Sequence, residues 1–261
     1  MKIVVCIKQV PDTDRISLDP KTGTLIREDV PAAINPFDLY AIEEGVRIKE
    51  KTGSQVKVIS MGPPPAETAL RDALALGCDE AFLLTDSDFA GADTLATSYT
   101  LACGIKKIGD FNLIICGVKT TDGDTGQVGP GLAQELDIPQ ITYVNKILEI
   151  DDHHIKAERL IEDGLEVINS PLPCLITVLK GINQPRLPTF KAKIAAKKAS
   201  ITVWGADKLD VDKSRVGLKG SPTHVVKLST PPPPSGGEVF TGSSSEAVEK
   251  LVKKLQDLKL I

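Results

Sequence analysis

Residues 116–130, CGVKTTDGDTGQVGP, have the composition of a nucleotide-binding turn between a strand and a helix. Gly123 and Gly126 let the backbone fold closely, and free N–H groups at the start of the following helix could hold a diphosphate. Asp122 and Asp124 disfavour side-chain contact with phosphate and favour sugar hydroxyls or capping. The predicted donors are the backbone N–H groups of Gly126, Gln127 and Val128 and the hydroxyls of Thr120, Thr121 and Thr125. The turn matches neither GxGxxG nor GxxxxGKS/T, so a long polar turn is the alternative.

A second candidate is the stretch GADTLATS at residues 91–98. Thr94 and Thr97 are three positions apart, which places both hydroxyls on one helical face. There they could donate hydrogen bonds to a ligand at the helix start. The alternative is an ordinary helix capped by Asp93.

A third candidate, residues 180–198, has the features of a docking loop. Pro185 and Pro188 stiffen it, Leu187 and Phe190 are apolar among polar neighbours, and basic residues follow. An apolar anchor with a polar rim is typical of protein-docking surfaces. The alternative is a loop whose two apolar side chains tuck inward.

The remaining chemistry-bearing residues favour neither a metal centre nor a nucleophilic catalyst. The five cysteines are widely spaced without a CxxC, so we expect buried free thiols, and the three histidines form no constellation. Lys+Arg 31 against Asp+Glu 35 gives a net charge of −4, which argues against a general nucleic-acid or membrane-surface binder. There is no bilayer-length apolar run and no leader pattern, so we expect a cytoplasmic protein.

The elements that must position these residues predict an α/β fold class. We expect a mostly parallel Rossmann-like sheet flanked by helices, then antiparallel hairpins and an extended C-terminal arm with one helix. Parallel strands are expected near residues 3–7, 56–61, 81–84 and 113–116, with helices near 36–53, 66–77, 93–108 and 125–136. The hydrophobic period then changes to two, which predicts hairpins from strands at 143–150, 155–160 and 165–168, and 173–179 forms a further strand.

The tail has a different composition. From Thr202 onward no sustained core pattern is present, residues 231–234 are a polyproline stretch, and 235–237 are a flexible linker. Ser243 and Glu246 have capping-box spacing before an apolar helical stripe, which must be buried on its own domain or on a partner. We therefore expect an α/β nucleotide-binding domain at 1–203 and a C-terminal arm at 204–261.

Ligands of open parallel sheets bind beyond the carboxyl ends of the strands. Four stretches are expected at that edge: residues 6–9, 35–40, 61–64 and 117–127. Without reference to any family, this arrangement also fits an adenine-nucleotide-binding signalling module that folds without a partner. The lone tail helix argues against that alternative.

Taken in order, several stretches resemble the beta subunit of an electron transfer flavoprotein. They are VVCIKQVPDT, INPFDLYAIEEGVRIKE, MGPP, LRDALALGCDEA and DGDTGQVGP. Ala157-Glu158-Arg159, followed by IEDGLEVINSPLPCLIT, is similar to the most diagnostic stretch of that family. NQPRLPTF, residues 183–190, resembles its recognition loop for flavoprotein dehydrogenases, and the tail resembles the arm that wraps around the alpha subunit.

The resemblance implies a heterodimer whose alpha subunit carries one FAD, with a second nucleotide in the beta subunit. In simple shuttles that nucleotide is AMP. In the bifurcating branch it is a second FAD, which takes electrons from NADH and sends them to ferredoxin and to a flavin-dependent dehydrogenase of acyl-CoA or enoyl-CoA type, or a lactate dehydrogenase. The glycine spacing and the GADTLATS stretch resemble the bifurcating branch, so FAD is favoured over AMP. The subunit is expected to be inactive alone, with no catalytic side chain and no metal.

Carried over residue by residue, the resemblance implies a cofactor site assembled from five stretches. They contribute Cys6 and Lys8; Asn35, Pro36, Phe37, Asp38 and Tyr40; Met61; Asp93, Thr94 and Thr97; and Cys116, Gly117, Thr120, Asp122, Gly123, Asp124, Thr125, Gly126, Gln127 and Val128. Leu187 and Phe190 would anchor the dehydrogenase. Because the turn is acidic, we expect a compensating Arg or Lys from the alpha subunit.

Overall fold

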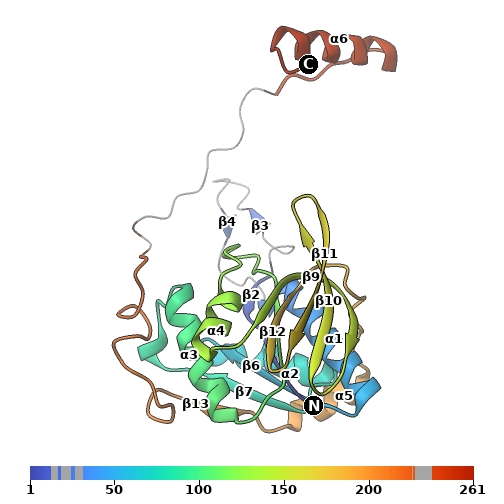
Figure 1. The fold of residues 1–261 in the computed structure, drawn as a ribbon. Coiled ribbons are helices and arrows are strands. Elements are labelled where there is room, and N and C mark those ends of the chain that lie inside the picture. Colours follow the sequence, from blue (N-terminus) through green and yellow to red (C-terminus); the bar gives the residue numbers. More distant parts are fainter. Residues whose placement is uncertain (13–16, 19–24, 27–31, 225, 227–236) are drawn as a thin grey trace. The chain divides into compact units, whose positions relative to one another are not determined.

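The computed structural model describes residues 1–12, 17–18, 25–26, 32–224, 226 and 237–261. The chain divides into two compact units, Met1–His224 and Val225–Ile261. Within the described residues, the first unit is built on a nine-stranded sheet in the order β11-β10-β9-β12-β8-β1-β6-β7-β13 (Figure 1).

The core of the sheet is parallel and its far end is antiparallel, which confirms the expected α/β class. The central parallel strands are β1 (Lys2–Cys6), β6 (Gln55–Met61), β7 (Glu80–Leu84), β8 (Leu113–Gly117) and β12 (Cys174–Val178). The antiparallel extension consists of β9 (Gln140–Ile150), β10 (His154–Ile161) and β11 (Gly164–Pro171). Short pairs join β2 (Gln9–Pro11) to β5 (Ala32–Ile34) and β3 (Ser17–Leu18) to β4 (Leu25–Ile26).

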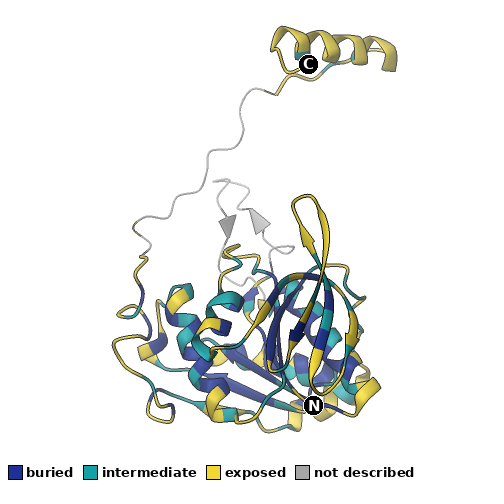
Figure 2. Cartoon of the chain, viewed as in Figure 1, coloured by how far each residue is buried: buried dark blue, intermediate teal, exposed yellow. Residues whose placement is uncertain are grey.

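Helices cover both faces of the parallel strands. α1 (Pro36–Thr52) and α2 (Glu67–Leu76) pack on one face, and α3 (Thr94–Ile108) and α4 (Val128–Leu136) on the other. Strand side chains alternate between the faces, so Ile3 and Val5 join the α1/α2 core while Val4 and Cys6 join the α3/α4 core. The strands are therefore buried on both sides, as the dark blue arrows of Figure 2 show.

The crossover after β7 sets the place of the ligand site. The chain passes by α3 to the second face and returns in β8, which pairs with β1 on the side away from β6. The topological switch point therefore lies between the carboxyl ends of β1 and β8. 3-10 turns lie at η2 (Pro64–Ala66) and η3 (Ser87–Phe89), beyond β6 and β7.

The helix after β8 begins later than the sequence predicts. α4 starts at Val128 rather than at Thr125, because Asp124 and Gly126 have left-handed backbones with φ of 53° and 64°. The preceding turn is correspondingly longer.

The basic segment expected as a loop is helical in its second half. Phe190–Lys198 form α5, in which the Oγ1 atom of Thr189 accepts a hydrogen bond from the Ala192 N–H at 3.1 Å. The Lys/Ala composition has high helix propensity, so a helix here was readable from the sequence. α5 packs on α2.

Residues after Thr202 carry more structure than the expected arm. β13 (Thr202–Trp204) pairs with β7, and Ala206, Leu209 and Val216 are buried against the α3/α4 core. The first compact unit therefore ends after His224 rather than at residue 203. Single apolar residues between polar ones leave no periodic pattern to detect.

The second unit contains the expected tail helix, α6 (Ser244–Asp257). The capping box between Ser243 and Glu246 is confirmed, with both reciprocal hydrogen bonds present. The stripe consists of Val248, Leu251, Val252, Leu255 and Leu258. The predicted polyproline stretch lies outside the described residues. Within the described part of the chain, no helix has the length and apolarity that a membrane span requires.

Candidate functional site

The switch point brings together the first and last predicted stretches. Cys6 and Cys116 are register partners at the ends of β1 and β8. The backbone N–H of Lys8 donates to the Asp38 Oδ2 atom at 2.7 Å, which ties the end of β1 to the first turn of α1. A Cβ atom on Gly117 would collide with the Asp38 Oδ1 atom, so the end of β8 packs closely against the same turn.

Asn35 connects the end of β1 to the glycine turn after β8. Its side chain is fully buried, its Nδ2 donates to the Lys119 carbonyl at 2.9 Å, and its Oδ1 accepts from the Thr121 N–H at 3.2 Å. Its own backbone N–H donates to the Lys8 carbonyl at 2.9 Å. Asn35 therefore shapes the site by holding the glycine turn against the end of β1.

Burial raises the pKa of Asp38 to about 7, although hydrogen bonds from the Lys8 N–H, Asn35 and the Gly117 N–H act to lower it. This carboxyl therefore changes charge near neutral pH at the base of the crevice. The folded chain holds a proton between the ordinary pKa of 3.8 and about 7 that the unfolded chain has released. The contribution of Asp38 to stability is therefore greatest in acid and declines as the pH rises through that window.

Urea unfolding of the wild-type chain and of Asp38→Asn between pH 4.5 and 7.5 checks this dependence. The free energy of unfolding of the wild type is expected to fall with rising pH relative to that of the variant. The full difference is on the order of 4 kcal/mol at about 1.4 kcal/mol per pKa unit. Parallel pH profiles for the two proteins would contradict the assignment.

The acidic residues of the glycine turn are neutralised within this chain. The Lys8 Nζ lies 2.6 Å from the Asp122 Oδ2, and the Lys119 Nζ lies 2.7 Å from the Asp124 Oδ1. Partial burial acts to raise the pKa of Asp122, but the hydrogen bonds from Lys8 and Thr120 outweigh it and keep the carboxyl ionised. Two lysines of the same chain thus neutralise the carboxylates of the turn. An Arg or Lys of the alpha subunit that compensates a reduced anionic flavin stays a prediction.

The start of α4 offers free donors beside this turn. The backbone N–H groups of Gly126, Gln127 and Val128 make no hydrogen bond within the described residues. A Cβ atom on Gly126 would lie 3.4 Å from the Val118 carbonyl oxygen, so the turn follows the backbone after β8 closely. The three N–H groups predicted as donors are therefore unpaired in the fold, and their contact with a ligand stays a prediction.

The GADTLATS stretch lies beside the glycine turn, but its Asp93 caps α3. The Thr94 Oγ1 donates to the Gln127 Oε1 at 2.8 Å, which joins the starts of α3 and α4. The Asp93 Oδ1 accepts from the Leu95 and Ala96 N–H groups, as the capped-helix alternative predicts. The other oxygen of Asp93 accepts from the Thr223 hydroxyl at 2.7 Å. Thr97 begins the second turn of the same helix, on the face of Thr94.

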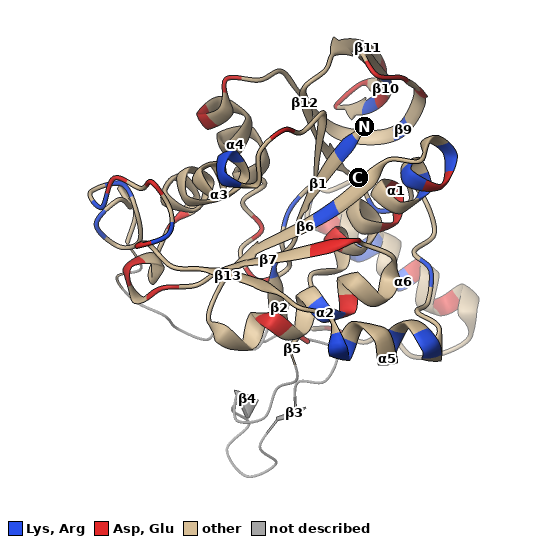
Figure 3. Cartoon of the chain, turned by 90° about the horizontal axis from the view of Figure 1, so that it is seen from below, with Lys and Arg blue, Asp and Glu red and all other residues tan. Residues whose placement is uncertain are grey.

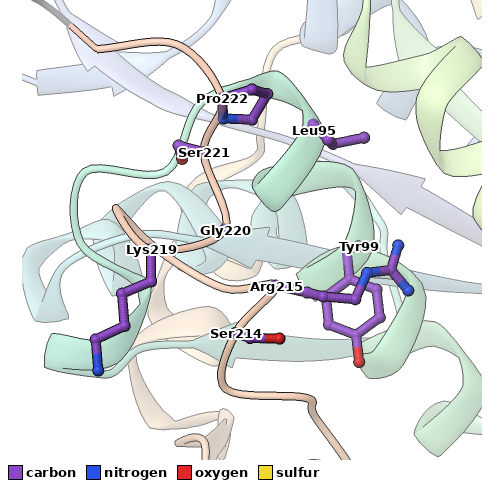
Figure 4. A pocket seen from close by; sticks show the side chains of 8 residues that line it. All are labelled: Leu95, Tyr99, Ser214, Arg215, Lys219, Gly220, Ser221 and Pro222. Atoms are coloured by element: carbon purple, nitrogen blue, oxygen red, sulfur yellow. The ribbon is translucent and has the colours of Figure 1, made fainter.

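Residues 214–222 pack beside the start of α3, a contact that the sequence did not predict. Ser214, Arg215 and residues 219–222 line a cavity of about 340 Å³ with Leu95 and Tyr99 of α3 (Figure 4). The Arg215 guanidinium lies 3.9 Å from the centre of the Tyr99 ring and 2.6 Å from Glu135. No motif marks this segment, because its contacts with α3 are made by isolated side chains.

A larger cavity of about 630 Å³ lies over the carboxyl ends of β6 and β7. Met61 and the following glycine and prolines line one side, and η3 with residues 90–92 lines the other. Met61 therefore borders open space at the same sheet edge as the switch point. Pro36 is exposed and Phe37 and Tyr40 are partly buried on the first turns of α1.

All five cysteines are free, and Cys6, Cys78, Cys116 and Cys174 are buried, as expected. A hydrogen bond with Cys6, together with burial, raises the pKa of Cys116 well above its usual value. The Cys116 thiol at the switch point therefore stays protonated and serves as a packing group. Within the described residues there is no group of side chains suited to a metal ion.

Leu187 and Phe190 point into solvent rather than inward. Their exposed fractions are 91% and 80%, which excludes the alternative of a loop that buries both side chains in this unit. The exposed apolar pair therefore matches the geometry predicted for a docking loop.

The fold and its crevice define a doubly wound α/β protein with its ligand edge at a switch point. Residues 22–209 match the electron transfer flavoprotein domain family. The chain is 52% identical, over all of both chains, to an electron transfer flavoprotein subunit beta of Thermoanaerobacterium thermosaccharolyticum. It is 46% identical, again over both full lengths, to the caffeyl-CoA reductase-Etf complex subunit CarD of Acetobacterium woodii. It is 45% identical to the protein FixA of Bradyrhizobium diazoefficiens over 97% of this chain and 90% of FixA. The chain belongs to the electron transfer flavoprotein family, with a beta-subunit role.

Proposed function

We propose that this beta subunit pairs with an alpha subunit and holds FAD in the crevice between β1 and β8. In this proposal the complex receives electrons from NADH and bifurcates them to ferredoxin and to a flavin-dependent dehydrogenase of acyl-CoA or enoyl-CoA type. The similarity to the subunit named for a caffeyl-CoA reductase-Etf complex supports an oxidoreductase partner of this kind. In the same proposal, a lactate dehydrogenase is the other candidate for the partner dehydrogenase.

The single observation that carries the nucleotide assignment is the free donor set at the start of α4. The unpaired N–H groups of Gly126, Gln127 and Val128 lie next to a turn whose carboxylates are each paired with a lysine. A helix N-terminus with its orphan donors stabilises negative charge, and a diphosphate carries that charge. The residues present therefore fit an adenine dinucleotide.

The side chains of this subunit bind and orient the cofactor and need not react. The flavin supplies the hydride and electron chemistry when bound. Asn35 holds the turn in place, Asp38 fixes the end of β1 to α1, and the threonines 94, 97 and 120 offer hydroxyls. Lys8 neutralises Asp122 and so offsets a carboxylate charge that would repel an anionic ligand group.

The alternative is a simple shuttle whose beta subunit holds structural AMP in the same crevice. The threonines at the start of α3 support FAD in this proposal, because the Thr94 hydroxyl bonds to Gln127 and so brings the start of α3 beside the free donors of α4. This stretch also resembles the bifurcating branch.

Nucleotide release from the purified heterodimer distinguishes the two proposals. Denaturation followed by chromatography is expected to yield two FAD per heterodimer. One FAD with one AMP would establish the shuttle, and one FAD with no second nucleotide would contradict both. Reduction by NADH, followed by reduction of ferredoxin only when the dehydrogenase substrate is also present, tests bifurcation separately.

The loop before α5 is the proposed docking site for the dehydrogenase. Leu187 and Phe190 are exposed, and the α5 lysines Lys191, Lys193, Lys197 and Lys198 lie beside them. In Figure 3 the lysine positions of α5 are coloured blue along its ribbon. This surface fits an apolar socket with an acidic rim on the dehydrogenase. The arm with α6 is proposed to bury its apolar stripe on the alpha subunit.

A further inference from the structure

The docking loop is held to α1 by one arginine. The Arg186 guanidinium donates to both carboxylate oxygens of Glu43, at 2.8 and 3.2 Å. It also donates to both oxygens of Glu50, at 2.6 and 3.0 Å. The backbone N–H of Arg186 adds a further bond to Glu43 at 3.1 Å. The side chain thus spans two carboxylates that lie seven residues apart on one face of α1.

The contacts around Arg186 extend this attachment along the loop. The Asn183 Nδ2 donates to the Tyr40 carbonyl at 3.0 Å and to the Glu44 Oε2 at 2.9 Å. Behind the loop, the Arg71 Nη1 donates to the carbonyls of Ala196, Lys197 and Ala199 at the end of α5. The loop and α5 are therefore fixed at both ends, on α1 and on α2.

The backbone of the loop is held in place, whereas its two large apolar side chains are exposed to solvent. Leu187 follows Arg186 directly and is 91% exposed, and Phe190 opens α5 and is 80% exposed. Glu43 has only 8% of its side chain exposed, so the attachment reaches into the edge of the core. Ordering a loop before docking removes part of the entropy cost of binding.

We infer that Arg186 is a positioning residue, which holds the docking loop in the conformation that presents Leu187 and Phe190 together. This inference rests on the docking role proposed above. A planar guanidinium can bridge two carboxylates with parallel hydrogen bonds, whereas an ammonium group cannot hold that geometry. We therefore expect loss of Arg186 to raise the KM for the dehydrogenase and to leave kcat unchanged.

The test measures electron transfer from the full, reduced heterodimer to a purified flavin-dependent acyl-CoA dehydrogenase over a range of dehydrogenase concentrations. Arg186→Ala is expected to raise the KM for the dehydrogenase about tenfold, because the loop must then be ordered during docking. The kcat at saturation and the nucleotide content should stay unchanged. Arg186→Lys is expected to restore only part of the affinity, and hydrogen exchange of the amides of residues 182–190 should be faster in Arg186→Ala.

Arg47→Ala is the matched control, because Arg47 is on α1 and contacts Glu44 at 4.0 Å without touching the loop. It should leave KM unchanged. If Phe190→Ala raises KM but Arg186→Ala does not, the inference is overturned while the docking role stands. If neither variant raises KM, the docking role itself falls. Should Arg186→Ala fail to fold, Glu50→Gln removes one arm of the attachment, and a KM equal to the wild-type value would overturn the inference.

Discussion

Replacing Gly117 with alanine is expected to empty the nucleotide site. A Cβ atom at this position would collide with the Asp38 Oδ1 and would lie 2.9 Å from the backbone carbon of Phe37. Both neighbours belong to the first turn of α1, which cannot yield without moving the helix. The shift would disturb the hydrogen bond from the Lys8 N–H to Asp38 and strain the bridge from Asn35 to the glycine turn.

Overpacking of this kind costs about 1–3 kcal/mol of unfolding free energy. The nucleotide content of purified Gly117→Ala heterodimer is expected to fall at least tenfold, by release and quantification, with a lower urea midpoint. Gly123→Ala is the comparison within the same turn. Its Cβ would meet only the Thr120 Oγ1, at 3.3 Å, and a hydroxyl can rotate away. Full nucleotide content in Gly117→Ala would show that the crevice between β1 and β8 is not the site.

Phe190→Ala is expected to lower kcat/KM for electron delivery to the dehydrogenase by about 30-fold or more, the range of a central apolar anchor. Phe190 has 80% of its surface exposed, so the fold should not depend on it. Bound nucleotide and the urea midpoint should therefore match those of the wild type. The rate should also fall with added salt, because α5, which begins at the anchor, carries four lysines.

The control for Phe190 is Val203→Ala on the edge strand β13, where a partly exposed apolar side chain lies outside the loop. Stopped-flow oxidation of the reduced heterodimer by the dehydrogenase gives the rate for each variant. Wild-type kinetics for Phe190→Ala with intact nucleotide content would remove the docking assignment. An equal loss in Val203→Ala would point to a general surface effect.

The sequence predicted the parts of the molecule that depend on local periodicity. Continuous apolar runs marked β1, β6, β7 and β8, and amphipathic patterns marked the helices between them, because strands buried on both faces need such runs. The position of the glycine turn after β8 followed from the same pattern. The capping box of α6 was readable because its two residues lie three positions apart.

Other features were not readable, since they rest on side chains that only folding brings together. Residues 205–224 joined the first unit through Ala206, Leu209 and Val216, which show no period. The hydrogen bond from the Thr223 hydroxyl to Asp93, the cap of α3, joins residues 130 positions apart. The ion pair between Lys8 and Asp122 joins residues 114 positions apart, and it neutralises one carboxylate of the glycine turn.

By itself the sequence determined the alternation of the main strands and helices up to β12, the chemistry of the turn after β8 and the family resemblance. The tertiary structure decided which groups those elements bring into contact: Asn35 with the glycine turn, Asp38 with the ends of both strands, and Arg186 with Glu43 and Glu50. The physical reason is that hydrophobic periodicity encodes which face of an element is buried. It does not encode which polar groups meet at a sheet edge, because that depends on the crossover that returns β8 to the side of β1.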